Sequence, residues 1–325
     1  MASKLVDLSE GVWIYEHLNA LASGLLPPGV LLLYGTGRPG VDSFIKAVAE
    51  IFNLPRSSVQ IWAHIRKVLA VGTDAPRAPL NQSAINENSS QYWRVQVVEV
   101  TGSTQEDLAV AVTIGDAFAG DVIAAEYQRM GRGRLDRTFE AESSTALMFS
   151  FAIAPQRSKN YWSYLPLLAG IAVAESINSL NPHMICRLKW PNDLLIGEKK
   201  LGGIIAQTVG DNVIIGIGIN VEMSTDQLPV SHATSIAIEG GQNLNRNDLL
   251  ATILKNFEAA LRKWEAGDDM QDQYRVLSST IGKAIEAHLP GGALKTGKAL
   301  NIDHHGGLIL DTGEVITSGD VIHLR

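Results

Sequence analysis

The most informative stretch of the chain, residues 188–203, reads LKWPNDLLIGEKKLGG. Apolar runs lie on either side of Pro191 and Asn192, two residue types that favour a turn. Trp190 comes directly before that turn, and a large aromatic side chain usually anchors a fixed structure. The pattern predicts an anchored turn. An exposed hairpin with ordinary surface charges is the alternative interpretation.

The charged residues of this stretch suit phosphate or carboxylate chemistry. Asp193 lies six residues before Lys199 and seven before Lys200, which lets an acid and a base face each other across a hairpin. A lysine in that place neutralises charge on a phosphate or on a developing carboxylate. The aspartate can accept hydrogen bonds or help to hold Mg²⁺.

A second cluster, residues 131–137, is a small cationic segment in an acidic chain and reads GRGRLDR. Its arginines and glycines are Arg132, Arg134, Arg137, Gly131 and Gly133. Arginine stays charged and carries a fork of donors that matches phosphate or carboxylate oxygens. Glycine lets the backbone approach closely and change conformation. The cluster predicts an anion-binding loop, with a solvated arginine loop as the alternative.

A third cluster, residues 216–220, reads GIGIN within a predicted strand. Alternate glycines remove the side chains from one face of a strand, so that a ligand or another backbone can lie against it. Asn220, at the end of the run, offers both a donor and an acceptor. A bend or bulge in a sheet is the alternative explanation of the same glycines.

The composition limits the classes of protein to consider. The chain has 325 residues, 46% hydrophobic and 19% charged, a globular balance that allows two or three domains. Its formal net charge of −7 lacks the global basic field that suits nucleic acid or an anionic membrane. Cys186 is the one cysteine, which excludes an internal disulfide and a multi-cysteine zinc site and is expected to be a small buried hydrophobe. With no secretory signal and no apolar run of the ~18 residues that span a bilayer, we expect a soluble cytoplasmic protein.

Changes in pattern along the chain predict three folded parts and a linker. Residues 1–73 are expected to form a mostly helical unit, and residues 74–90 have the composition of a linker. Residues 91–271 are expected to form an α+β domain, and residues 272–325 a small β-barrel of about five strands. In the α+β domain we predict helices at 103–117, 161–180 and 245–266, and strands at 93–100, 121–127, 145–153, 187–196, 201–210 and 212–223.

Residues 92–325 resemble the biotin–protein ligases, the family of biotin–[acetyl-CoA-carboxylase] ligases and holocarboxylase synthetases. The segments that carry the resemblance are TGSTQEDL (101–108), AEYQRMGRGRLDR (125–137), LKWPNDLLIGEKKLGGI (188–204), GIGINV (216–221) and GDVIHLR (319–325). The resemblance implies a class II synthetase-like mixed β-sheet with helices in the catalytic domain. It also implies that the C-terminal barrel is SH3-like.

The resemblance further implies a reaction and its substrates. Biotin attacks the α-phosphate of ATP through its carboxylate, which gives biotinyl-5′-AMP and pyrophosphate. A lysine in the biotin carboxyl carrier domain of a biotin-dependent carboxylase then attacks the mixed anhydride, and AMP leaves. Attack of one anion on another requires cations, including Mg²⁺ on the nucleotide, for which no protein ligand is assigned.

Individual side chains acquire roles by the same resemblance. The catalytic group is Arg132, Arg134, Lys200 and Asp193, with Asp193 implicated in transfer to the acceptor lysine. The biotin site is Ser103, Thr104, Gln105, Gln128, Gly131, Arg132, Gly133, Arg134, Lys200 and Gly203. The adenylate site is Arg134, Arg137, Trp190, Asn192, Gly218 and Asn220. In the family the arginine loop closes over biotin and the phosphate, which excludes water from a hydrolysable anhydride.

Two departures from the family pattern stand out. Leu135 and Asp136 follow the GRGR run, where the family often has Arg-Gly or His-Gly. Asp136 adds a negative charge and is expected to weaken loop closure unless it pairs with Arg137. Phe139 stands where the family usually has tryptophan, so the aromatic face is kept and the indole donor is lost.

The N-terminal unit has two weak motifs. Residues 41–69 have helix-turn-helix spacing, with cationic side chains in or near the second helix: Arg56, His64, Arg66 and Lys67. The near-zero net charge of residues 1–90 and the lack of a clear β-wing argue against DNA binding. Residues 35–40 match G-x-G-x-x-G, but no acidic residue ends a second strand about 20 residues later. We expect a helical extension whose role the sequence does not give.

Three alternatives stay open. In the first alternative, the substrate acid is lipoate, because lipoate ligases share the central fold and the activation chemistry. The GRGR and KWPND motifs favour biotin over lipoate. In the second, the chain is a biotin-responsive DNA-binding repressor. In the third, the family's sheet edge pairs either with a second copy of the chain, which gives a homodimer, or with the carrier, and these two contacts compete in some members.

Overall fold

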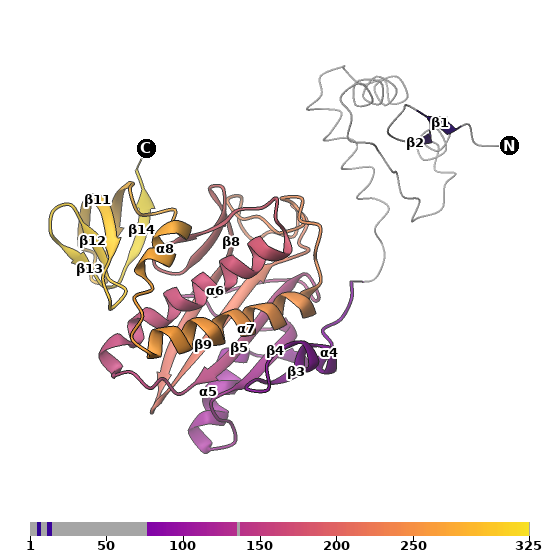
Figure 1. Cartoon of the computed structure of the whole chain (residues 1–325), viewed down its shortest axis with the longest axis horizontal. Coiled ribbons are helices and arrows are strands. Elements are labelled where there is room, and N and C mark those ends of the chain that lie inside the picture. Colours follow the sequence, from indigo (N-terminus) through magenta and orange to yellow (C-terminus); the bar gives the residue numbers. More distant parts are fainter. Residues whose placement is uncertain (1–4, 8–11, 15–76, 135–136, 325) are drawn as a thin grey trace. The chain divides into compact units, whose positions relative to one another are not determined.

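The structure is a computed structural model in which the chain divides into two units, Met1–Pro76 and Arg77–Arg325 (Figure 1). The residues that it describes are 5–7, 12–14, 77–134 and 137–324. In the first unit, β1 (Leu5–Asp7) and β2 (Val12–Ile14) pair antiparallel, so the prediction of helix is wrong for these two segments. The predicted helix-turn-helix and glycine motifs lie outside the described residues.

Seven strands of the second unit form one mixed sheet, in the order β3-β4-β5-β9-β8-β7-β6. Their bounds, in that order, are Arg94–Thr101, Asp121–Gln128, Ala146–Ile153, Asn212–Asn220, Lys199–Val209, Asp193–Ile196 and Cys186–Lys189. Within this sheet β3 and β4 are parallel, and the other neighbours are antiparallel. The sequence therefore predicted the α+β class correctly.

One predicted strand is wrong. The run 187–196 is two antiparallel strands, β6 and β7, which fold back on each other around Trp190, Pro191 and Asn192. Proline has no N–H to donate to a strand ladder, so this position suits the turn better than a strand interior. The anchored turn predicted there is present.

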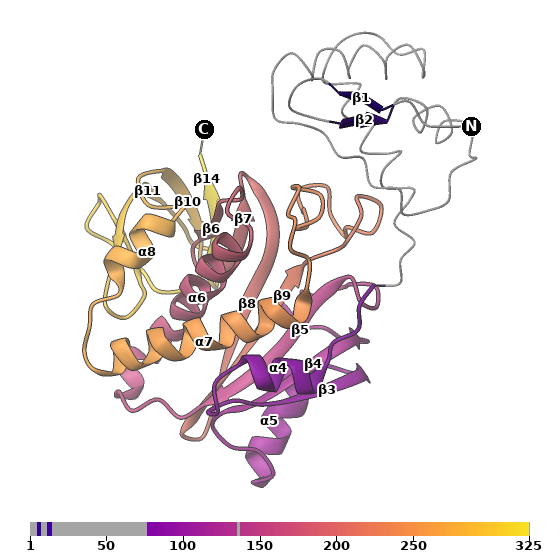
Figure 2. The same ribbon diagram turned by 45° about the vertical axis from the view of Figure 1, so that its right-hand side comes forward.

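Helices cover both faces of the sheet (Figures 1 and 2). The long helices α6 (Leu165–Leu180) and α7 (Arg246–Glu265) pack side by side against the main core, and α6 follows a short 3₁₀ helix, η1 (Lys159–Tyr164). Helix α5 (Thr104–Ile114) lies on the other face, over a smaller apolar cluster. Successive residues of a strand point to opposite faces, so alternate positions of β9 face α5.

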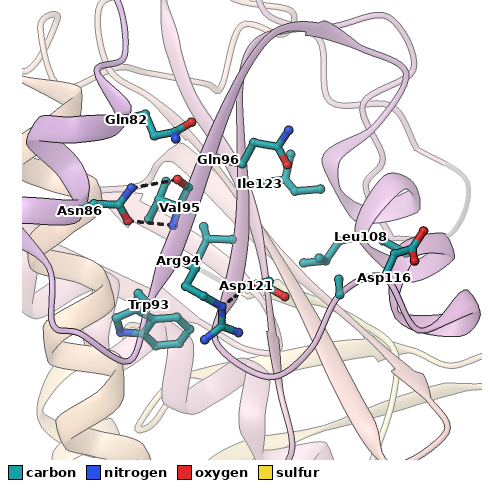
Figure 3. A pocket seen from close by; sticks show the side chains of 13 residues that line it. Gln82, Asn86, Trp93, Arg94, Val95, Gln96, Leu108, Asp116, Asp121 and Ile123 are labelled. Carbon is teal, nitrogen blue, oxygen red and sulfur yellow. Dashed lines mark hydrogen bonds and ion pairs between the residues drawn. The ribbon is translucent and has the colours of Figure 1, made fainter.

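Helix α4 (Gln82–Asn88) occupies part of the segment predicted as the linker, residues 74–90. Ile85 is fully buried, so α4 is part of the folded unit. The Asn86 side chain accepts a hydrogen bond from the Val95 N–H at 2.9 Å and donates one to the Val95 carbonyl at 3.0 Å (Figure 3). An amide side chain thus takes the place of a neighbouring strand at the edge of β3. The linker interpretation is wrong for these residues.

The last part of the chain forms a separate five-stranded antiparallel sheet, in the order β13-β12-β11-β10-β14. The strands β10 to β14 are, in chain order, Ala284–His288, Leu294–Ile302, Leu308–Leu310, Val315–Ile316 and Asp320–His323. It follows helix α8 (Gln271–Leu277). Trp190 is buried and donates through its indole N–H to the Gly306 carbonyl at 2.9 Å, which fastens this sheet to the β6–β7 turn.

A buried ion pair connects α7 to the large sheet. Arg246 Nη1 lies 2.8 Å from Glu126 Oε2, and the two side chains are 1% and 10% exposed. Arg246 also donates to the carbonyls of Ala146 and Ala78, and Glu126 accepts from the Leu80 N–H. Burial alone raises the pKa of Glu126, but the hydrogen bonds and charge of Arg246 and the Leu80 N–H hold it below its ordinary value.

We predict that Arg246→Ala destabilises the fold by about 3–5 kcal/mol at pH 7, because it leaves the Glu126 carboxylate buried without its cation. Since the folded-state pKa of Glu126 is lowered, the stabilisation is present above the ordinary value of about 4.5 and is lost as pH falls through the folded-state value. Urea unfolding of both proteins from pH 7 to pH 3 measures this difference.

Arg262→Ala is the matched control on the same helix. Arg262 is 75% exposed where it pairs with Glu258, so its removal is expected to cost less than about 1 kcal/mol. Equal losses in the two variants, or an Arg246→Ala loss that does not shrink in acid, contradict the assignment of Glu126 and Arg246 as a buried charged pair.

Candidate functional site

Three predicted site residues form one row across the large sheet. Asp193 of β7 is the register partner of Gly203 of β8, and Gly203 is the register partner of Gly218 of β9. The two glycines leave the middle of this row without side chains. The row therefore provides a flat backbone surface with one carboxylate at its end.

The glycines of β9 are required by what lies against them. A Cβ on Gly218 would lie 2.8 Å from ring atoms of Phe139, and a Cβ on Gly216 would lie 2.5 Å from Gln105 Oε1. Ser150, the register partner of Gly216, lies beside the same space. The predicted close approach to these glycines is present. The groups that approach are an aromatic ring that follows the arginine loop and a side-chain amide of α5.

Polar side chains gather at the start of α5. Ser103 is its N-cap residue, and Thr104 donates from its N–H to Gln128 Oε1 at 2.8 Å. Thr104 Oγ1 also lies 2.8 Å from Ser150 Oγ. Two atoms of this cluster, Ser103 Oγ and Gln105 Oε1, are buried without a hydrogen-bond partner. Buried polar atoms are normally paired, so this pair of orphan atoms indicates a polar ligand.

The predicted cations meet at the β6–β7 turn. Lys200 Nζ lies 2.5 Å from Asp193 Oδ1, with the side chains 34% and 23% exposed. Arg134 donates from Nη1 to Asn192 Oδ1 at 3.2 Å. Burial lowers the pKa of Arg134, whereas the carboxylates of Asp320 and Asp193 raise it and the charge of Arg137 lowers it. The turn therefore holds one lysine and one arginine whose positive charges lie partly away from water.

The arginine loop closes on itself as a narrow hairpin. Phe139 N–H donates to the Gly131 carbonyl at 2.9 Å, and Gly133 N–H donates to the Arg137 carbonyl at 2.7 Å. A Cβ on Gly131 would lie 2.2 Å from the Phe139 carbonyl oxygen, so only glycine fits. Arg132, which pairs with Thr138 in an isolated bridge, has an exposed side chain. Leu135 and Asp136 lie outside the described residues, so the proposed pairing of Asp136 with Arg137 is not described.

The C-terminal sheet contributes groups to the loop that the sequence did not predict. Arg137 Nη2 donates to Asp320 Oδ2, and Arg134 Nη1 lies 3.9 Å from Asp320 Oδ1 and donates to the Gly319 carbonyl at 3.3 Å. Residues 319–325, GDVIHLR, contributed to the resemblance in the sequence, but no function was assigned to them there. No local pattern links positions 183 residues apart, and only the fold brings them together.

Two predicted adenylate residues lie in the core. Trp190 is 2% exposed, with its indole donor already used, which fits its predicted anchoring role better than a ligand contact. Asn220 is 5% exposed and donates to the Thr234 carbonyl at 2.8 Å.

Cys186 is fully buried, and burial raises the pKa of its thiol to about 12, so the expectation of a buried hydrophobe is confirmed. A pocket of ≈ 670 Å³ lies at the N-terminal ends of the parallel strands β3 and β4 (Figure 3). No predicted site residue lines this pocket.

Comparison with known proteins gives the family. The biotin/lipoate A/B protein ligase family model matches residues 97–223, and the biotin protein ligase C-terminal domain model matches residues 280–324. The biotin–[acetyl-CoA-carboxylase] ligase of Mycobacterium tuberculosis is 35% identical over 266 residues, which cover 78% of this chain and 98% of that protein. The chain belongs to the biotin protein ligase family.

Other relatives of this biotin protein ligase agree. The bifunctional ligase/repressor BirA of Escherichia coli is 31% identical over 71% of this chain and 74% of its own length. The biotin protein ligase of Aquifex aeolicus, solved in complex with biotin and ATP, superposes with a TM-score of 0.61 at 26% identity, over 71% of this chain and 98% of that chain. Sequence and fold thus identify the same family.

Two features are absent from the described ranges of the chain. Among those residues there is no group of three or more His, Cys, Asp or Glu side chains arranged to hold a metal ion. No helix in the same part of the chain is long and apolar enough to span a bilayer.

We predict that Gly218→Ala destabilises the fold by about 1–3 kcal/mol, because the new methyl group displaces the Phe139 ring. Gly203→Ala, on the register partner, is the matched control. Its Cβ would lie 3.8 Å or more from its neighbours, so the stability stays near that of the original chain. Guanidinium unfolding measures both. A Gly218→Ala protein as stable as Gly203→Ala would show that Phe139 does not pack on β9.

Proposed function

We propose that the chain is an ATP-dependent biotin–protein ligase that forms biotinyl-5′-AMP and transfers biotin to a lysine of a carrier domain. The observation that carries the proposal is the meeting of Lys200, Arg134 and Asp193 at one turn, beside a polar cluster with orphan buried atoms. Membership of the biotin protein ligase family supports the same conclusion.

The polar cluster at the start of α5 is the proposed binding site for the ring end of biotin. A cyclic urea carries N–H donors and a carbonyl acceptor. Gln105 Oε1 is free to accept, and Ser103 Oγ is free to donate or accept. Gln128 and Thr104 already hold each other and fix the shape of this end. Gly203 of β8, where an added Cβ would lie 3.8 Å or more from its neighbours, leaves room on the sheet for the rest of a flat, narrow substrate.

The β6–β7 turn is the proposed site of adenylation. The carboxylate of biotin attacks the α-phosphate here, and Lys200, Arg134 and Arg132 offset the negative charge of both groups. Gly131 and Gly133 allow the loop to lie close to the ligand, and Arg137 holds it in that shape. Mg²⁺, bound to the phosphates of ATP, would supply further positive charge; no protein ligand is assigned to it.

Asp193 is proposed to act in the second step. Its 2.5 Å pair with Lys200 orients the lysine during adenylation. In transfer, the acceptor lysine loses a proton as its nitrogen attacks the anhydride carbonyl, and Asp193 is proposed to accept that proton. The AMP part of the intermediate is proposed to lie beside Asn192 and Gly218 until it leaves. Asn220 and Trp190 are proposed to support this site from the core rather than to contact the nucleotide.

The remaining features of the proposal concern partners and domains. The proposed acceptor is the biotin carboxyl carrier domain of a biotin-dependent carboxylase, in line with the acetyl-CoA carboxylase in the name of the 35% identical ligase. The five-stranded C-terminal sheet is proposed to be an SH3-like barrel, and residues 1–73 a mostly helical extension. Because the BirA relatives are bifunctional ligase/repressors, a biotin-responsive repressor is the second candidate function. A homodimer and a cytoplasmic location are part of the same proposal.

We predict that Lys200→Ala lowers biotin-dependent exchange of pyrophosphate into ATP by about 10²–10³-fold, the usual effect of removing one preorganised charge. Lys199→Ala is the matched control, because the neighbouring Lys199 is 55% exposed and pairs with Glu239 instead. We expect it to keep its rate within about twofold. Lipoate in place of biotin is expected to support no exchange.

The same reaction with a purified carrier domain tests the transfer step. Exchange with lipoate and none with biotin would replace the substrate assignment. Operator DNA binding without carrier labelling would favour the repressor. Equal rates in the Lys200→Ala and Lys199→Ala proteins would remove Lys200 from the site.

A further inference from the structure

We propose that Thr234 is a positioning residue that directs Lys200, and not its neighbour Lys199, toward Asp193. The inference rests on the proposed function, which assigns Lys200 to adenylation, but its structural part can be tested in the ligand-free chain. The two lysines are consecutive at the start of β8, and each pairs with a different carboxylate. Lys200 pairs with Asp193, and Lys199 pairs with Glu239 at 3.2 Å.

The strand alone does not fix which lysine reaches the site. Successive side chains of a strand point to opposite faces, so a slip of one residue would exchange Lys199 and Lys200. The pairing of β8 with β7 shifts between Leu194 and Leu195, which leaves Leu201 of β8 without a register partner in β7. An irregularity of this kind re-aims the side chains next to it. The direction of the two lysines therefore depends on contacts other than those with β7.

Those contacts come from residues 232–234, which lie along β8 beyond the end of β9. The Lys200 N–H donates to the His232 carbonyl at 2.8 Å, and the Thr234 N–H donates to the Lys200 carbonyl at 2.8 Å. Ala233, between them, forms a parallel bridge with Lys200. Strand β7 already occupies one edge of β8 here, so the segment occupies the other edge. Both backbone polar groups of the lysine are thus held by one short segment.

Thr234 is the fixed point of this segment. It is fully buried, and its carbonyl accepts a hydrogen bond from Asn220 Nδ2 at 2.8 Å, which joins it to the end of β9. Its hydroxyl donates to Glu239 Oε1 at 2.6 Å, and the same oxygen accepts from Lys199 Nζ. One residue therefore holds the Lys200 backbone through its N–H and the Lys199 side chain through Glu239.

The surroundings of the two lysines agree with this division. Lys199 lines a cavity of ≈ 240 Å³ whose other walls come from residues 225–238, and Lys200 does not line it. Two neighbouring ammonium groups compete for one carboxylate unless a second carboxylate holds one of them. Glu239 holds Lys199 in this way, which leaves Asp193 to Lys200.

The first test needs no activity and uses the full ligand-free chain. Thr234→Val keeps the size of the side chain and removes the hydroxyl that fixes the segment. We expect hydrogen exchange of the Lys200 amide, measured by NMR, to become about tenfold faster, in line with the loss of one hydrogen bond to a charged group. Thr234→Ser is expected to restore the rate. Ser176→Ala is the control, because it removes a fully buried hydroxyl from α6 and should leave this amide unchanged.

The second test measures exchange of pyrophosphate into ATP. Thr234→Val is expected to lower kcat about tenfold and to leave KM for biotin and for ATP within about twofold, because a displaced Lys200 loses an interaction that strengthens as charge develops. In the Lys200→Ala background, Thr234→Val should have no further effect, since it acts through that lysine. A purely structural defect would lower the rate in both backgrounds.

The third test concerns the competition between the lysines. Glu239→Gln is expected to lower kcat about tenfold, because Lys199 then competes for Asp193. Adding Lys199→Ala to Glu239→Gln should return the rate to within about twofold of the unchanged protein, since no second ammonium group remains. This pair of variants leaves the buried threonine intact, so it decides the matter even where Thr234→Val folds poorly.

Three results would overturn the proposal. An unchanged Lys200 amide in Thr234→Val would show that the hydroxyl does not hold the segment. A tenfold loss that persists in the Lys200→Ala background would show that Thr234 does not act through this lysine. A Glu239→Gln loss that Lys199→Ala does not recover would show that the lysines do not compete. If the unchanged protein fails to activate biotin while the amide responds as expected, the proposed function is wrong and the positioning of Lys200 stands.

Discussion

The site depends on gathering positive charge in a partly buried place without a ligand to offset it. Each of the three cations has a polar or acidic partner from another part of the fold. The cations are Lys200, Arg134 and Arg137. Asp193 comes from the neighbouring strand, Asn192 from the turn, and Asp320 from the C-terminal sheet. Each cation still has N–H groups beyond those used in these pairs. The proposed function requires the cations to stay in place and to receive a phosphate and a carboxylate.

The large sheet supplies the geometry for this balance. The register that aligns Asp193, Gly203 and Gly218 places one acid at the end of two glycines, the second of which lies under the Phe139 ring. Helix α5 then brings its polar first turn over the same face of the sheet. The proposed ring site and the charged cluster thus lie on the same face of the sheet. Glycine in β9 serves both, because larger side chains would meet Phe139 or Gln105.

Sequence patterns predicted what local chemistry controls. The fully apolar run of β5, the amphipathic α7 and the Ser103 start of α5 follow from spacing and residue type. The split of 187–196 into two strands was missed, because apolar runs on both sides of Pro191 read as one strand. Helix α4 was missed because its small and amide residues have a linker's composition, whereas their role is to pair with the edge of β3.

For the candidate site, motifs identified the cations and the glycines, and the resemblance to a family decided between the alternative interpretations of each run. Their partners were beyond the sequence. Asp320 is one acid among many in the chain, and nothing near it in sequence refers to the loop. Ser150 and Gln105 meet Gly216 only because two strands and a helix bring them together. Contacts of this kind are products of topology, which residue spacing does not encode.

The most direct measurement is a crystal structure of the chain with a non-hydrolysable analogue of biotinyl-5′-AMP. The account predicts nitrogen atoms of Lys200, Arg134 and Arg132 within about 3 Å of the oxygens where the acyl group joins the phosphate, with the ring end beside Ser103 and Gln105. An analogue bound with its phosphate remote from these three cations, or seated in the pocket beside α4, would contradict it.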